Sequence, residues 1–293
     1  MLIHKSPHCF LFFLTFFLAC SASASEYITK IRLNVEHTNN SGLLSKSQAQ
    51  HDIKVAPSLV IDYRIGSGNF QSNLNYSATR NDYMKNTFAD RSDVLGSGTF
   101  LWKIFDRTLV WNLSQNRRRL KIDSLLGNDP SNQTNRNILQ TGPRLTIGFG
   151  RNNTFAVDAS YVESSFSQGS TNNSQQERLG LEYQRIINAQ DKLKVTVLAA
   201  ESKFDDSIFD YQFQRYNVTL ESNPRNFQYS IAIGHNSIDR NMGASLSGPY
   251  LSFSVSANKS NSSWSFSGNR ELTDSSIGIG VSENLPDSRF NRD

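Results

Sequence analysis

The sequence has few cysteines, no large excess of either charge, and no second long hydrophobic run. Both cysteines, Cys9 and Cys20, lie near the N-terminus, so a chain cleaved after them has no disulfide and no cysteine-ligated metal. The 30 Lys and Arg residues stand against 26 Asp and Glu, and a net charge of +4 is too mild to indicate a nucleic-acid-binding protein. The mean hydropathy of −0.47 excludes a protein with several membrane-spanning helices. Aromatic residues form 11% of the chain, which argues against disorder.

The N-terminus has the organisation of an export signal. Lys5 precedes the apolar run CFLFFLTFFLA (Cys9–Ala19), and Ala22-Ser23-Ala24 matches the small-residue pattern of a signal-peptidase site. The apolar run is shorter than the roughly 20 residues that a spanning helix needs. A lipoprotein signal with Cys20 as the modified residue is the alternative. We predict a cleaved signal peptide over residues 1–24.

The rest of the sequence repeats with a period of two residues, which is typical of strands with one apolar and one polar face. From Ile53 to Ile65 the odd positions are apolar, whereas the even positions include Lys54, Asp62 and Arg64. The same alternation recurs at 154–161, 192–199, 227–234 and 250–257. No segment keeps a period of 3.6 residues, so we predict almost no helix.

Short and long connections are expected to alternate along the chain. Clusters of Gly, Asn, Asp and Pro, which close hairpins, fall at 66–69, 105–107, 150–153, 188–191, 223–226 and 258–261. Longer polar stretches lie between them, at about 38–51, 80–92, 116–135, 164–174, 203–210 and 237–248. This layout is typical of an outer-membrane barrel, which has short periplasmic turns and long outer loops.

These patterns predict one domain over residues 25–293, an all-β, antiparallel, up-and-down transmembrane β-barrel. Lipid offers no hydrogen-bond partners, so a strand protein can cross it only as a closed barrel. The clear strands lie between Tyr27 and Arg270, and a weaker one at Ile277–Val281 brings the expected number to about 14, because bacterial barrels normally have an even number. Residues 285–293 lack the terminal aromatic residue common in barrel proteins, so we expect either a longer barrel of which this chain is a part or an atypical closure.

No catalytic, cofactor-binding or metal-binding motif is present in the sequence. The three histidines after residue 24, His37, His51 and His235, are scattered. Residues 243–248 do not have the spacing of a nucleophile elbow, and no zinc, P-loop or dinucleotide pattern occurs. We therefore assign no catalytic residue, no cofactor and no metal, and expect a protein that is not an enzyme.

The candidate functional residues are charged. On the predicted polar strand faces, seven residues are expected to face the lumen, where they tune which solutes pass or pair with one another: Lys54, Asp62, Arg64, Arg144, Asp158, Glu182 and Lys194. A basic cluster, Arg117, Arg118 and Arg119, is expected at the start of the longest loop. It would contact anionic sugar or lipopolysaccharide phosphate, or form a solvated strand end. The three tryptophans are expected in an interfacial girdle.

The stretch NLNYSATRNDYMKNTFADRSDVLGSGTFLWKIFDRTLVWNLSQN (Asn73–Asn116) resembles outer-membrane proteins associated with PEP-CTERM/exosortase systems. In that family a Y-S/T-x-x-R-Y-like strand, a polar loop and an L-x-x-x-G-x-x-x-L/W…D-R hairpin follow one another in this order. WSFSGNRELTDSS (Trp264–Ser276) is also similar to a segment of the family. The resemblance implies a β-barrel encoded near exopolysaccharide biosynthesis and export genes, with no defined enzymatic activity. Family members tend to be longer, which implies further strands after the T-D-S-S segment.

Taken together, these features predict a protein of the bacterial outer membrane that works in exopolysaccharide biosynthesis or export, or in the PEP-CTERM protein-sorting system. The expected partners are outer-membrane lipid and lipopolysaccharide, polysaccharide and its export proteins, and the barrel assembly machinery, but not nucleic acid. The alternatives are a general porin or channel, an outer-membrane barrel enzyme, and a soluble periplasmic all-β binding module.

Overall fold

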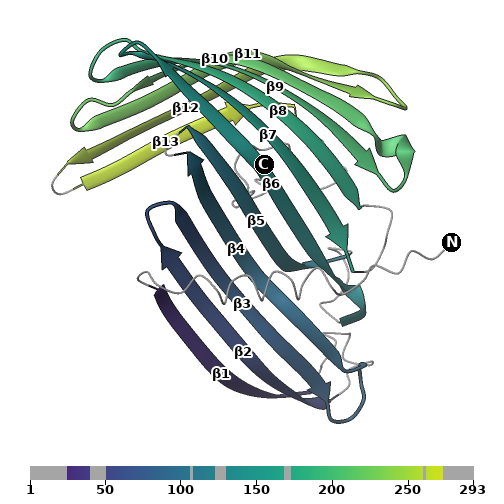
Figure 1. The fold of residues 1–293 in the computed structure, drawn as a ribbon. Coiled ribbons are helices and arrows are strands. Elements are labelled where there is room, and N and C mark those ends of the chain that lie inside the picture. Colours follow the sequence, from purple (N-terminus) through teal and green to yellow (C-terminus); the bar gives the residue numbers. More distant parts are fainter. Residues whose placement is uncertain are drawn as a thin grey trace.

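In the part of the chain that the structure describes, thirteen antiparallel strands form one continuous curved sheet, in which the strands lie in the order of the chain (Figure 1). Their bounds are β1 (Ser25–Thr38), β2 (Asp52–Gly66), β3 (Phe70–Tyr83), β4 (Arg91–Phe105), β5 (Leu109–Lys121), β6 (Gln133–Phe149), β7 (Asn153–Phe166), β8 (Ser174–Ile186), β9 (Asp191–Phe204), β10 (Tyr211–Ser222), β11 (Phe227–Arg240), β12 (Leu246–Lys259) and β13 (Ser262–Arg270). The expectation of an all-β, antiparallel, up-and-down fold is therefore confirmed.

The computed structural model describes residues 25–39, 51–105, 108–122, 130–167, 173–259 and 262–272. The predicted signal peptide and the candidate strand at Ile277–Val281 lie outside the described residues. Within them the only helical segments are two single 3₁₀ turns, Pro130–Asn132 and Ser207–Phe209. None of the described segments is a helix of the length and hydropathy needed to cross a membrane.

The alternation of short and long connections is confirmed. Brief links join β2 to β3, β4 to β5, β6 to β7, β8 to β9, β10 to β11 and β12 to β13, whereas the connections between the other neighbouring strands are longer. All short links therefore lie at one end of the sheet, and all long connections lie at the other. We call these the short-link end and the long-loop end.

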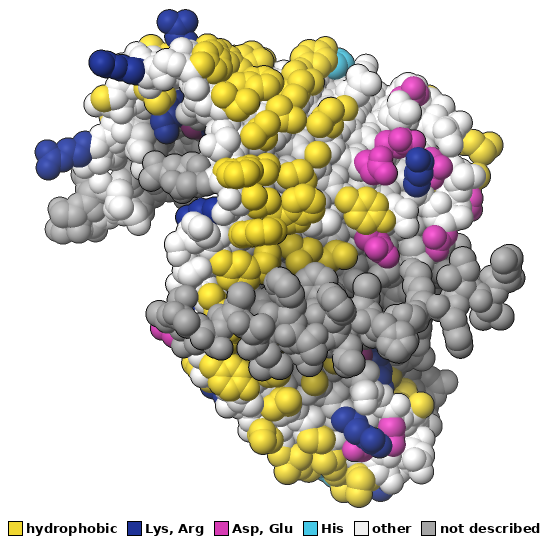
Figure 2. Space-filling model, viewed as in Figure 1, with side chains coloured by type: hydrophobic (Ala, Val, Ile, Leu, Met, Phe, Trp, Pro, Cys, Tyr) yellow, Lys and Arg dark blue, Asp and Glu magenta, His cyan; other side chains and the backbone are white. Residues whose placement is uncertain are grey.

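One face of the sheet, here called the apolar face, is hydrophobic from the first strand to the last. The register places Val197 on β9 opposite Leu181 on β8 and Tyr216 on β10, and the same face continues through Ile233 on β11. These side chains are exposed, for example 45% for Val197 and 60% for Ile233. Figure 2 shows such hydrophobic side chains gathered in bands on the side turned toward the viewer.

The opposite face, here called the polar face, holds the small buried core. Leu198, Ala200, Phe204, Tyr211, Phe213 and Ile238 form one buried cluster on β9, β10 and β11, near the long-loop end. Most other side chains of this face are polar. The sheet thus buries part of its polar face and exposes its apolar face, the reverse of what a water-soluble sandwich does.

Aromatic side chains gather on the apolar face near the short-link end. Trp102 of β4 lies opposite Trp111 of β5, and Trp264 of β13 is 54% exposed. Ring pairs with centroids 4.3–6.4 Å apart extend this row across the sheet: Tyr27–Tyr63, Phe70–Phe100, Phe149–Tyr183 and Phe227–Trp264. The row runs from β1 to β13, along one edge of the apolar band.

The two outermost strands each pair on one side only among the described residues. β1 pairs with β2 over its whole length, from Ser25 opposite Ile65 to Thr38 opposite Asp52. β13 pairs with β12 from Arg270 opposite Leu251 to Ser262 opposite Lys259. The described sheet therefore has two edges.

β10 and β11 lie close together at Gly234, and a substitution there tests this close approach. A Cβ atom at Gly234 would lie 2.1 Å from the carbonyl oxygen of Tyr216 and 2.6 Å from Cβ of Asn217, so the two strands would have to separate. We expect Gly234→Ala to lower the free energy of unfolding by about 1–3 kcal/mol, measured by chemical denaturation followed through tryptophan fluorescence. Gly148→Ala on β6 is the control, because nothing lies within 4 Å of its Cβ position. Equal losses in the two variants would contradict the close approach.

Candidate functional site

The polar face is concave and lines an open cavity of about 790 Å³. Glu26 on β1 and Arg64 on β2 line the same cavity as Asp158 and Ser160 on β7, although four strands lie between β2 and β7. Strands so far apart in a sheet line one cavity only where the sheet curls around it. The curvature therefore places the polar face inside and the apolar face outside.

The cavity wall is rich in hydroxyl and amide groups. The neutral polar residues that line it come from five neighbouring strands, β3 to β7: Gln71, Ser72, Asn73, Thr99, Asn112, Ser114, Gln140 and Ser160. Its charged residues are two acids and two bases, Glu26, Asp158, Arg64 and Arg144. Such a surface can both donate and accept hydrogen bonds, and its formal charges balance.

Three of the predicted lumen residues form one ionic group on the polar face. Arg144 of β6 places Nη1 3.4 Å from Oδ2 of Asp158 on β7, and Nη2 3.0 Å from Oε1 of Glu182 on β8. Gly180 makes this reach possible, because it lies opposite Asp158 and leaves room for the carboxylate; a Cβ atom there would lie 2.6 Å from Oδ1. One guanidinium therefore bridges two acids across three strands.

The other predicted lumen residues lie on the same face in separate pairs. The three pairs are Lys54 Nζ and Glu36 Oε2 at 3.5 Å, Arg64 Nε and Asp62 Oδ1 at 3.5 Å, and Lys194 Nζ and Glu221 Oε1 at 2.7 Å. Each charge in the predicted set thus has an opposite charge nearby. Glu36 and Glu221 were not in the predicted set; the cross-strand register that puts Glu36 opposite Lys54 was the missing signal.

The basic cluster Arg117, Arg118 and Arg119 is not in a loop but within the last five residues of β5, so the predicted loop position was wrong and the alternative of a strand end holds. All three residues belong to β5, which continues to Lys121 and pairs with β6 along its whole length. Because side chains alternate between faces, Arg118 lies on the face opposite to that of Arg117 and Arg119. The three charges therefore do not form a single patch.

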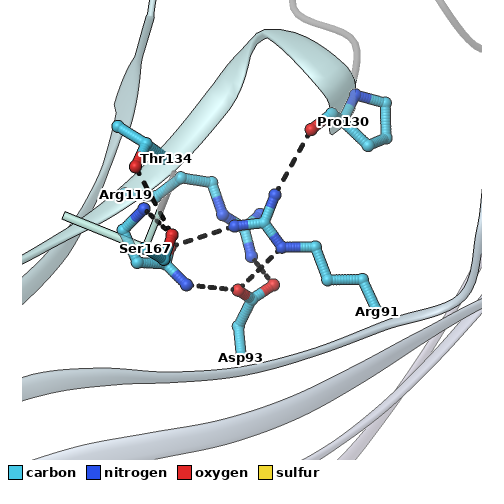
Figure 3. A network of polar contacts seen from close by, with 7 residues as sticks. Arg91, Asp93, Arg119, Pro130, Thr134 and Ser167 are labelled. Atoms are coloured by element: carbon cyan, nitrogen blue, oxygen red, sulfur yellow. Dashed lines mark hydrogen bonds and ion pairs between the residues drawn. The ribbon is translucent and has the colours of Figure 1, made fainter. Parts of the chain in front are cut away.

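Asp93 is the centre of a buried ionic network that sequence reasoning missed (Figure 3). Its carboxylate is fully buried and accepts hydrogen bonds from Arg91 Nε at 2.9 Å, from Asn135 Nδ2 at 2.6 Å, and from Arg119. Arg91 also donates to the carbonyl oxygen of Pro130 and to Asn135 Oδ1. The network ties β4 to β5 and β6 at the long-loop end. The Arg-x-Asp spacing of Arg91 and Asp93 indicates only this local pair and not the contacts with β5 and β6.

The described residues hold no group of three His, Cys, Asp or Glu side chains arranged to bind a metal ion. His235 instead stacks on Tyr216 on the apolar face, with ring centroids 5.6 Å apart.

Comparisons with known proteins found no matching family model and no matching curated protein. Solved structures with some likeness include an outer-membrane channel from Pseudomonas putida F1, with 10% identity and a TM-score of 0.39 over 78% of this chain and 93% of that one. A bacterial polysaccharide outer-membrane secretin has 10% identity and a TM-score of 0.43 over 80% of this chain and 87% of that one. OpdQ of Pseudomonas aeruginosa has 12% identity and a TM-score of 0.36 over 80% of this chain and 76% of that one.

Asp93→Asn tests the buried network. The substitution leaves the cations of Arg91 and Arg119 without their shared carboxylate, so we expect the free energy of unfolding to fall by about 3–5 kcal/mol. The matched control is Asp62→Asn, which removes an acid whose partner Arg64 is 60% exposed and should cost less than about 1 kcal/mol. Chemical denaturation of both variants measures the difference. Similar small losses would show that the network contributes nothing beyond an exposed ion pair.

Proposed function

We propose that this chain is a non-enzymatic β-barrel protein of the bacterial outer membrane, which gives a solute a polar path across the bilayer. The observation that carries the proposal is the division of the sheet into an exposed apolar face on the outside and a polar, concave face on the inside. We further propose that the path serves exopolysaccharide biosynthesis or export, or the PEP-CTERM system.

The exposed apolar face favours lipid as its surroundings. Exposed side chains such as Ile31, Val197 and Ile233 would each leave apolar area in water, at about 25 cal/mol per Å². A soluble binding module buries such a face against a second layer, whereas here the described residues bury only a small cluster on the opposite face. A bilayer provides the apolar surroundings that this surface requires.

The strands and their ends also fit a bilayer. The described strands have 9 to 17 residues, and about 9–11 residues cross a bilayer when tilted. The aromatic row near the short-link end fits the interfacial girdle of such barrels, and the short links fit the periplasmic side. At the long-loop end the apolar face becomes polar, with Glu177 opposite Glu201, as expected where the sheet leaves the lipid.

The wall of the cavity supports a polysaccharide as the solute. Its hydroxyl and amide side chains match the hydrogen-bonding groups of sugars, and its charges are balanced. The segment that resembles the PEP-CTERM-associated proteins, Asn73–Asn116, covers most of β3 and all of β4, and extends into β5, three of the strands that line the cavity. A general channel is the alternative function, and polymer block distinguishes the two.

Membrane insertion is tested by two neighbouring substitutions on β9. Val197→Arg puts a charge on the apolar face and should cost about 2–4 kcal/mol of folding free energy in a bilayer. Thr196→Arg is the control, because Thr196 lies on the polar face opposite Glu182. Refolding into lipid vesicles, scored by the different gel mobility of unheated and boiled samples, should show a loss for Val197→Arg alone. Equal effects, or a wild-type chain that stays in solution without lipid, would contradict the barrel.

Channel function is tested by conductance in planar bilayers. We expect a neutral polysaccharide to block the current of the wild-type protein, and Gln140→Leu in the cavity wall to weaken this block about fivefold, the effect of about 1 kcal/mol for a lost hydrogen bond. Gln212→Leu is the control, since Gln212 is exposed on the apolar face. Conductance without block would indicate a general channel. Insertion without any conductance would contradict a path.

A further inference from the structure

After β13 the chain turns onto the concave polar face, where Glu271 and Leu272 dock against β10, β11 and β12. Oε2 of Glu271 lies 3.4 Å from Nη1 of Arg215 on β10. Leu272 packs against the buried cluster that contains Phe213 and Ile238. The two residues thus place a carboxylate and an apolar side chain in adjacent positions of one site.

Arg215 is a buried cation within this site. Its side chain is 3% exposed, whereas the basic side chains in the other ion pairs of the described residues are 20–63% exposed. The guanidinium carbon lies 4.9 Å from the ring centroid of Tyr250 and 5.6 Å from that of Phe213. Aromatic faces stabilise a guanidinium, but a buried charge still needs a counter-ion.

Asn236 completes the site with one hydrogen bond to the backbone of β12 and one to the backbone of the docked segment. It is fully buried and lies between Arg215 and Gly248 in the register. In the amide orientation that satisfies its neighbours, its nitrogen donates to the carbonyl oxygen of Gly248 at 2.9 Å, and its oxygen accepts from the backbone N–H of Leu272 at 2.9 Å. Gly248 has no side chain, and Leu272 fills the space over it; a Cβ atom there would be in ordinary contact with Leu272.

We propose that Arg215, Asn236 and Tyr250 form a carboxylate-binding site inside the concave face, and that Glu271 is its resident ligand, which a solute carboxylate can replace. The site contacts three groups of the docked segment. Arg215 binds the carboxylate of Glu271, Asn236 accepts a hydrogen bond from the backbone N–H of Leu272, and the apolar cluster packs against the side chain of Leu272. Its ligand class is therefore a small carboxylate with an adjacent apolar group. The proposal rests on the proposed function only in that the polar path leads solutes to the site.

Chemical rescue by acetate tests the site. Glu271→Ala removes the resident carboxylate from the buried guanidinium, so we expect the thermal midpoint of the folded protein in detergent micelles to fall by about 10 °C. Acetate should restore most of this loss, because it binds only the folded state. Sodium chloride at the same ionic strength should restore little. Rescue that is no greater with acetate than with chloride would overturn the proposal.

Two further variants complete the experiment. The double variant Arg215→Met with Glu271→Ala should not respond to acetate, since the cation is gone; a response equal to that of the single variant would place the acetate elsewhere and overturn the assignment. If Glu271→Ala does not fold, Glu271→Gln keeps the size of the side chain and is titrated in the same way. Because these measurements need neither a bilayer nor a current, specific rescue in a protein without conductance would leave the site standing while the channel function fails.

Discussion

Backbone hydrogen bonding between neighbouring strands is the constraint on which the rest of this structure depends. Every strand from β2 to β12 is paired on both sides, and the register shifts at only one place among the described strand pairs, between Lys103 and Phe105. Since side chains alternate with a period of two, a constant register assigns each of them to a face across the whole sheet. The apolar face and the polar face both follow from this.

The sheet carries its charges in two different ways. Around the cavity, the cations are partly exposed and each has an acid nearby, as in the bridge from Arg144 to Asp158 and Glu182. Such pairs leave the wall polar while contributing little to stability. Asp93 and Arg215 are buried, so each depends on its partners for charge compensation, and both lie toward the long-loop end. The charges that decide stability are thus not those that line the cavity.

Much of the fold was predictable because its signals are local. The alternation from Ile53 to Ile65, and the hairpin clusters such as 223–226, need only neighbouring residues to be read. The ionic contacts were harder, since Lys54 meets Glu36 only through the register that follows the first long connection. The basic cluster at Arg117–Arg119 was placed in a loop because polar composition was taken as the end of a strand. The part of a strand that lies beyond the apolar side chains can be polar on both faces and still pair, as residues 114–119 of β5 do.

Contacts between distant segments were beyond sequence reasoning for a different reason. Glu271 and Arg215 are 56 positions apart. The alternation of apolar and polar residues in the two segments does not indicate that the chain turns inward after β13. The Asp93 network likewise joins residues from three strands, although its Arg-x-Asp spacing is local. In both cases the burial that makes the charge important exists only in the folded sheet.

The direction of the two edge strands has a consequence for how the sheet can close. β1 and β13 both run from the short-link end to the long-loop end, because an odd number of alternating strands begins and finishes in the same direction. Direct contact between them would be parallel, unlike every other pair in the sheet. One more strand that runs the opposite way would lie antiparallel to both edges at once, so the parity of the strand count decides whether closure keeps a single hydrogen-bonding pattern around the ring.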